Sequence, residues 1–133
     1  MEPNNTLTVA RLYVDAVSAK DFAAVAGLFA DDIVWHQPGN NAVSGTYSGG
    51  AAVGEMLAAQ MTATEGTFEL QLTGAPMVNG ALVVIPIHFS AQGADSEMSM
   101  DGIDVLRVEG DKIAEVWLFS ADQQAEDAFW GAG

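Results

Sequence analysis

The stretch Phe68-Glu69-Leu70-Gln71-Leu72-Thr73 marks a change of period in this chain. Apolar and polar residues alternate here, which is typical of a β-strand with one face toward a protein core and one toward water. Asn79-Gly80 then gives a strong signal for a two-residue hairpin between this strand and a strand over residues 81–91. Further strands are expected over residues 96–108 and 112–120, separated by turns at 92–95 and 109–111. The C-terminal half is therefore predicted to be an antiparallel meander.

The residues before this stretch follow a helical pattern instead. A first helix is predicted from apolar residues at helical spacing, namely Leu7, Ala10, Val14 and Val17, with Asn4, Asn5 or Thr6 as its cap. Asp21 can cap a second helix that has Phe22, Val25 and Phe29 on one face. A short strand over 33–37 and a polar loop over 39–50 precede a third helix, and residues 121–130 suggest a short last one. Helices followed by an antiparallel meander indicate an α+β fold, with the helices covering one concave face of a curved sheet.

Length and composition limit the classes of function that this chain can have. The 133 residues fit one domain, residues 1–133, and half of them are hydrophobic. Four basic residues stand against 18 acidic ones, so the surface is expected to repel nucleic acid and anionic membranes. The chain has no cysteine, which excludes disulfides and thiol nucleophiles. The N-terminus lacks the pattern of a signal peptide and no apolar stretch is long enough to span a bilayer, so we expect a cytoplasmic protein.

Asp104 is the first candidate for a functional residue. Strand alternation places it on one face with apolar residues or glycine, namely Met98, Met100, Gly102 and Leu106. A carboxyl on such a face is desolvated, which raises its pKa and lets it donate a hydrogen bond as a neutral acid. The alternative is an exposed Asp at a strand end. Tyr13 is the second candidate, because a helix position beside the apolar stripe can point its hydroxyl into a pocket, or can simply pack in the core.

The two histidines, His36 and His88, are the side chains that titrate near neutral pH without a pKa shift. His88 lies in an apolar strand on the same face as Val84 and Pro86, and it can serve as a general base if that face lines a cavity. His36 alternates with Trp35 and Gln37, so it is expected to point away from them. The two histidines are 52 positions apart with no carboxylate motif nearby, and we therefore predict no metal site.

Several large apolar residues are candidates for the walls of a substrate pocket: Trp35, Met98, Met100, Trp117 and Phe119. Methionines adapt to irregular ligands, and aromatic rings supply flat apolar walls. The alternative for all five is ordinary core packing.

Six segments resemble the nuclear transport factor 2-like superfamily, and within it the ketosteroid isomerase-like and SnoaL-like (polyketide cyclase-like) branch. They are Leu12-Tyr13-Val14-Asp15-Ala16-Val17-Ser18-Ala19-Lys20-Asp21, Leu28-Phe29-Ala30-Asp31-Asp32, Trp35-His36-Gln37-Pro38-Gly39, Ser44-Gly45-Thr46-Tyr47-Ser48-Gly49, Ile113-Ala114-Glu115-Val116-Trp117, and the tail from Asp122-Gln123-Gln124 to Phe129-Trp130. The last two are similar to a bacterial SnoaL-like subgroup. The resemblance implies a cone-shaped fold, with N-terminal helices packed on a strongly curved, mainly antiparallel sheet, and a homodimer formed through that sheet.

The same resemblance implies roles for individual residues. Ketosteroid isomerase uses an Asp base with an oxyanion hole made of a Tyr and a protonated Asp. Tyr13 and Asp104 stand at the positions that resemble the oxyanion hole, whereas Gln37 stands at the position of the base. An amide does not shuttle a proton between carbons at neutral pH, so the chain departs from the family pattern there.

The function expected from the sequence is a cofactor-independent isomerase, cyclase or lyase acting on a small hydrophobic carbonyl compound. Tyr13 and Asp104 would stabilise the oxyanion, His88 or His36 would move the proton, and Gln37 would orient substrate or water. Two alternatives remain open at this point. One is a protein that binds a small apolar ligand without catalysis, and the other is a hydrolase that activates water, for example on an epoxide.

Overall fold

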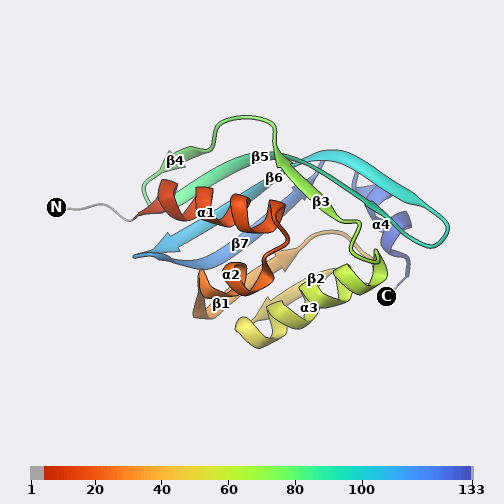
Figure 1. Cartoon of the computed structure of the whole chain (residues 1–133), viewed down its shortest axis with the longest axis horizontal. Helices are drawn as coiled ribbons and strands as arrows, with labels where there is room; N and C mark the ends of the chain where they lie inside the picture. The colour runs from red at the N-terminus through yellow and green to blue at the C-terminus, as the bar shows by residue number, and fades with distance from the viewer. Residues whose placement is uncertain (1–4, 133) are drawn as a thin grey trace.

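The computed structural model describes residues 5–132, which fold into helices on a single curved sheet (Figure 1). The elements in chain order are α1 (Thr6–Ser18), α2 (Phe22–Gly27), β1 (Phe29–Gln37), β2 (Gly45–Ser48), α3 (Gly50–Ala63), β3 (Glu69–Leu72), β4 (Met77–Asn79), β5 (Leu82–Gln92), β6 (Glu97–Glu109), β7 (Lys112–Ser120) and α4 (Gln123–Trp130). Figure 1 shows α1, α2 and α3 together on one side of the sheet, with α4 beside the far end of the long strands.

The sheet has the strand order β2-β1-β7-β6-β5-β3, and β4 pairs with β5. The pair β1–β7 is parallel, and the other pairs are antiparallel. The predicted α+β class and the mainly antiparallel, curved sheet are therefore confirmed. The parallel pair brings the first strand of the chain beside the last one, so residues near 35 and residues near 117 lie next to each other.

Two helices begin at an aspartate cap, and the sequence predicted the first of them, Asp21. The Asp21 carboxylate accepts a hydrogen bond from the Ala24 backbone N–H at 3.1 Å, and Asp122 does the same for Ala125 at 3.1 Å. Asn5 stands at the N-cap position of α1, but its side chain makes no capping bond. Asn4, the other asparagine expected there, lies outside the described residues.

Some expected details differ in the structure. Phe29 was expected on the second helix but begins β1, because α2 ends at Gly27. Leu7 was expected on the buried stripe of α1 but is 39% exposed, since the helix buries Val9 and Tyr13 in its place. The loop expected over 39–50 contains the short strand β2. The Asn79-Gly80 hairpin joins β5 to β4, and β3 pairs separately with the far half of β5.

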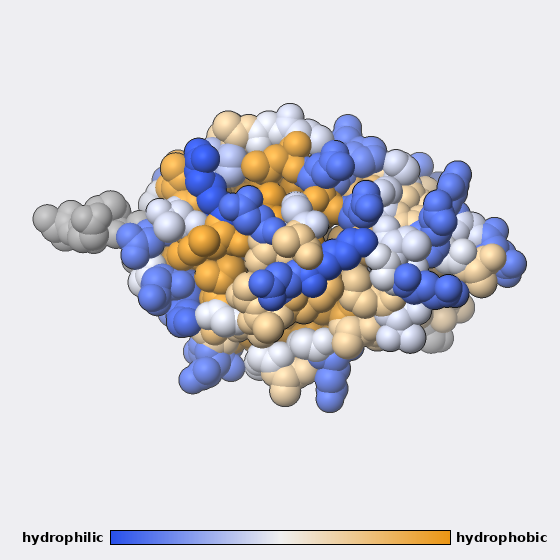
Figure 2. Space-filling view, in the orientation of Figure 1, coloured by the Kyte–Doolittle hydropathy of each residue, from blue (hydrophilic) through white to orange (hydrophobic). Residues whose placement is uncertain are grey.

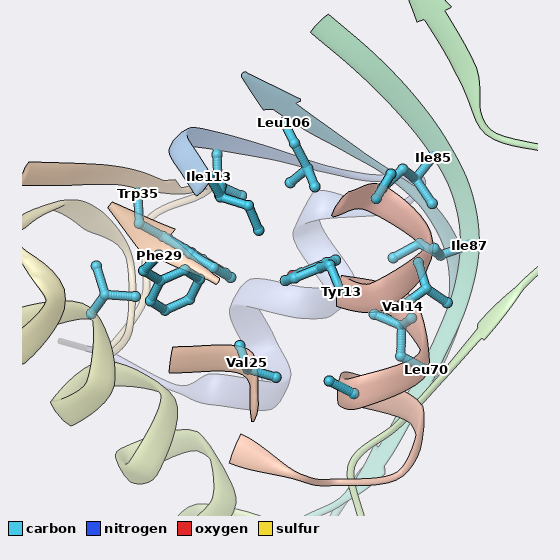
Figure 3. Close-up of a cluster of buried hydrophobic side chains, with 14 of the residues drawn as sticks. Tyr13, Val14, Val25, Phe29, Trp35, Leu70, Ile85, Ile87, Leu106 and Ile113 are labelled. Carbon is cyan, nitrogen blue, oxygen red and sulfur yellow. The ribbon is translucent and has the colours of Figure 1, made fainter. Parts of the chain in front are cut away.

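The core lies between the inner face of the sheet and the helices. Figure 3 shows Val14 of α1 beside Ile87 of β5, while Tyr13 extends from the other side of α1 into the buried cluster. Figure 2 shows apolar residues between the helices, bordered by polar and charged ones. Along β5 every second residue from Val83 to Ala91 is buried, so one face of the sheet is inner and the other is outer. None of the helices in residues 5–132 is both long and apolar enough to cross a membrane.

Candidate active site

A cavity of about 60 Å³ lies between the inner face of the sheet and the helices. Its walls are mostly apolar, formed by Val17, Phe22, Trp35, Leu57, Met61, Phe68, Leu70, Ile87, Phe89, Leu118, Phe119 and Trp130. Its polar side chains are Tyr13, Gln37, Gln60, Asp104, Ser120 and Glu126. The described lining includes two carboxyl groups and no Lys, Arg or His. A neutral ligand with a polar end therefore suits this cavity better than an anion.

Tyr13 and Asp104 meet in the cavity as a buried pair. Both are 3% exposed, and the Tyr13 hydroxyl donates a hydrogen bond to the Asp104 carboxyl. Burial raises the pKa of Asp104 to about 7, against the lowering effect of the bond from Tyr13. Burial, followed by the nearby Asp104 charge, raises the pKa of Tyr13 well above its ordinary value. Near and below neutral pH Asp104 holds its proton and can donate it to a ligand oxygen, and the single Tyr13 proton reaches the same oxygen once the hydroxyl turns away from Asp104.

Gln37 lines the cavity from the end of β1 and is 6% exposed. The Trp35 indole N–H donates to Gln37 Oε1 at 2.9 Å, which sets the orientation of the amide. The two N–H bonds of Gln37 Nε2 therefore point away from the indole, and they can donate to a ligand. This arrangement lets Gln37 hold an acceptor oxygen, but it gives the residue no means to take a proton from carbon.

Glu126 is the charged cavity residue that the sequence analysis missed, and the polar lining residues Gln60 and Ser120 were missed as well. Glu126 belongs to α4, lines the cavity and is 3% exposed. Its carboxylate accepts hydrogen bonds from Ser120, Gln123 and Trp130. A signal was available: Glu126, Phe129 and Trp130 are spaced three and four apart, so a helix over these residues places a carboxylate on its apolar face.

One sequence family matches most of this chain. The SnoaL-like domain, as a sequence family, matches residues 9–116. The chain belongs to the SnoaL-like domain family. This confirms the family resemblance seen in the sequence, while no functionally curated protein matches the chain.

Solved structures support the same fold for this SnoaL-like domain. A protein of unknown function with a cystatin-like fold from Xanthomonas campestris is 43% identical, with a TM-score of 0.91 over 96% of this chain and 98% of that one. TerC, co-crystallised with polyporic acid, is 17% identical, with a TM-score of 0.79 over 93% and 96% of the two chains. A protein with a ketosteroid isomerase-like fold from Catenulispora acidiphila, in complex with trimethylamine, is 17% identical, with a TM-score of 0.76 over 97% and 96%.

The two histidines of the SnoaL-like domain lie on the outer face of the sheet and do not line the cavity. His88 contacts Asp101 at 2.9 Å and Ser99 at 2.8 Å, because its strand position faces outward together with Pro86. His36 contacts Glu115 at 2.7 Å, and this hydrogen bond is the main cause that lowers the pKa of Glu115. The structure therefore separates both histidines from Tyr13 and Asp104.

The expected wall residues divide into three groups. Trp35 lines the cavity, and Phe119 lies at its rim with 56% of its surface exposed. Met98 and Met100 are buried on the inner face but belong to the core and not to the cavity lining. Trp117 is on the outer face, stacked on His36 with ring centroids 5.5 Å apart. No group of three or more potential metal-binding side chains is found within residues 5–132.

Proposed function

We propose that this SnoaL-like domain is a cofactor-independent isomerase, cyclase or lyase that acts on a small hydrophobic carbonyl compound. The observation that carries the proposal is the buried Tyr13–Asp104 pair in an apolar cavity. When Asp104 is protonated, Tyr13 no longer needs to donate to it, and a carbonyl oxygen beside the pair can accept one hydrogen bond from each group. These bonds strengthen as the oxygen gains negative charge in an enolate, so the pair lowers the barrier to enolate formation.

The non-catalytic binder remains the second candidate, and one observation favours it. Gln37 is held by Trp35 as a hydrogen-bond donor and stands where the family resemblance places a base. A site that only binds a carbonyl compound needs donors and apolar walls, and it needs no base. Turnover of a carbonyl compound, measured against simple binding, separates the two candidates.

Pentafluorophenol tests the oxyanion hole, because its ionised oxygen resembles the oxygen of an enolate. We expect it to bind the wild type at about pH 6, where the phenol is ionised and Asp104 is protonated. Tyr13→Phe removes only the hydroxyl and should weaken binding by about tenfold or more. Affinity should also fall as the pH rises through about 7, because Asp104 then becomes a carboxylate and repels the phenolate. Calorimetric titration across pH measures both effects.

Tyr47→Phe is the matched control for Tyr13→Phe. The Tyr47 hydroxyl donates to the Val43 carbonyl at 2.8 Å, and Tyr47 does not line the cavity. Its removal should leave phenol affinity unchanged. Absence of phenol binding in the wild type, or equal losses in the two variants, would contradict the oxyanion hole.

The outer face of the sheet supports the further proposal of a homodimer. Ile103 lies directly opposite Phe119, and Val105 lies opposite Trp117, which gives an apolar patch across β6 and β7. We expect Ile103→Lys to raise the dimer dissociation constant by about tenfold or more, since a buried charge would face the partner. Sedimentation equilibrium measures it, with Leu12→Lys on exposed α1 as the control. A wild type that is monomeric at high concentration would disprove the dimer.

A further inference from the structure

Glu126 is a buried carboxylate that lines the cavity. The oxyanion hole formed by Tyr13 and Asp104 gives it no role. Removing a carboxylate from water is costly, and such groups are kept inside proteins when they are well hydrogen-bonded or have a role in chemistry. Glu126 is held by hydrogen bonds, yet it also lines the cavity that contains Asp104. Its hydrogen bonds show which of its oxygens is available to a ligand.

The two oxygens of Glu126 are used unequally. Oε1 accepts from the Ser120 hydroxyl at 2.5 Å and from Gln123 Nε2 at 3.1 Å, so both of its lone pairs are occupied. Oε2 accepts one longer bond, from the Trp130 indole N–H at 3.2 Å. One lone pair of Oε2 is therefore left for a further proton. The three donors fix the position of the carboxylate while leaving this lone pair for a ligand.

The sheet register places this carboxylate within reach of a ligand bound at Asp104. Asp104 lies opposite Leu118 of β7, and Ser120, the partner of Glu126, is two residues further along the same strand and face. Strand spacing and rise then give roughly 8 Å between the backbones of Asp104 and Ser120. A carbonyl compound whose oxygen contacts Asp104 can therefore present a carbon one or two bonds away to Glu126.

Among the described residues that line the cavity, no other group is available to take a proton from carbon. Gln37 is an amide, both histidines are outside the cavity, and Asp104 is used as an acid. We propose that Glu126 is the catalytic base of this site and that its Oε2 removes a proton from the carbon next to the carbonyl held by Tyr13 and Asp104. This inference rests on the proposed function. It also narrows the substrate class to carbonyl compounds with an acidic C–H bond next to the carbonyl group.

The step balances without a cofactor. The C–H bond breaks, its proton forms an O–H bond on Glu126, and its electron pair becomes part of an enolate whose oxygen accepts hydrogen bonds from Tyr13 and Asp104. The enolate then takes the same proton back, at the original carbon or at a conjugated one. Return to the conjugated carbon completes an isomerisation and regenerates the Glu126 carboxylate.

Proton exchange of 2-indanone in D₂O tests the base, because this ketone has acidic C–H bonds on a small apolar ring. The NMR signal of these hydrogens should disappear faster with wild-type protein than in buffer. Glu126→Gln keeps the size of the side chain but cannot accept the proton, and it should slow catalysed exchange by about a hundredfold or more. Glu126→Asp keeps a carboxylate and should retain more activity than Glu126→Gln. Pentafluorophenol affinity, measured on each variant, reports whether the oxyanion hole is intact.

Asp127→Asn is the matched control. It removes the same charge from the same helix. The Asp127 carboxylate ties α4 to the protein through the Asn41 side chain and the Asn40 backbone N–H, but Asp127 does not line the cavity. The Asp127→Asn variant should catalyse hydrogen exchange of 2-indanone at the wild-type rate. If the wild type binds phenol but Glu126→Gln exchanges as fast as the wild type, or if the wild type gives no exchange above buffer, Glu126 is not the base and the oxyanion hole still stands. If the wild type does not bind phenol, the proposed function itself fails.

Discussion

Between about pH 4 and about pH 7, wild-type protein should lose about 3 kcal/mol of its free energy of unfolding relative to Asp104→Asn. The folded state holds the Asp104 proton up to a pKa of about 7, whereas an unfolded Asp releases it near its ordinary value of 3.8. Between these values only the folded state is protonated, so each pH unit removes about 1.4 kcal/mol from its stability. The stabilisation is complete below the unfolded pKa and is lost as the pH rises through the folded pKa. Urea unfolding at a series of pH values measures it.

Asn at position 104 is neutral at every pH and can still accept the hydrogen bond from Tyr13. A plot of the free energy of unfolding against pH for Asp104→Asn therefore lacks the loss expected of the wild type. Repulsion among the other acidic groups is common to both proteins and cancels in the difference. The control is Asp32→Asn, which changes an exposed Asp on β1. Its curve should run parallel to that of the wild type. Parallel curves for Asp104→Asn and the wild type would mean that Asp104 is ionised in the folded protein at acidic pH, and the oxyanion hole would lose its acid.

Leu106→Ala should destabilise the protein by about 2–5 kcal/mol, because it deletes buried methyl groups and leaves a void. Leu106 is fully buried on the inner face of β6, between Val83 of β5 and Val116 of β7, which are also fully buried. Figure 3 shows it in the same cluster as Tyr13 and Ile85. Urea unfolding should show a lower midpoint with an unchanged slope, since the surface exposed on unfolding hardly changes.

Leu72→Ala makes the same chemical change where the side chain is 42% exposed, at the end of β3. It should cost within about 1 kcal/mol. Leu106→Met keeps the volume and should recover most of the stability lost in Leu106→Ala. Equal losses for Leu106→Ala and Leu72→Ala would contradict the packing of helices on this face of the sheet.

Local patterns in the sequence were sufficient for the elements and for part of the site. Period-two alternation is a property of the strand backbone itself, so it grouped Asp104 with Met100 and Leu106 and grouped His88 with Pro86 before any tertiary contact was known. Asp21 and Asp122 cap helices through bonds to residues three positions away, which is also local information. Alternation says which residues share a face, but not which face is inner. His88 was therefore a candidate base until the structure placed its face outside.

Only the tertiary structure decided which of these groups share a cavity. Glu126 lies on a helix near the end of the chain, and it becomes a cavity residue because α4 folds back on β7 and contacts Ser120. The parallel pairing of β1 with β7 joins segments about 80 positions apart, and no periodicity encodes such a contact. The sequence by itself thus determined the α+β class, the strand faces and the Tyr13 and Asp104 candidates. The fold decided that Glu126, and neither histidine, lines the cavity of that pair, because the position of a helix on a sheet depends on the packing of the whole core.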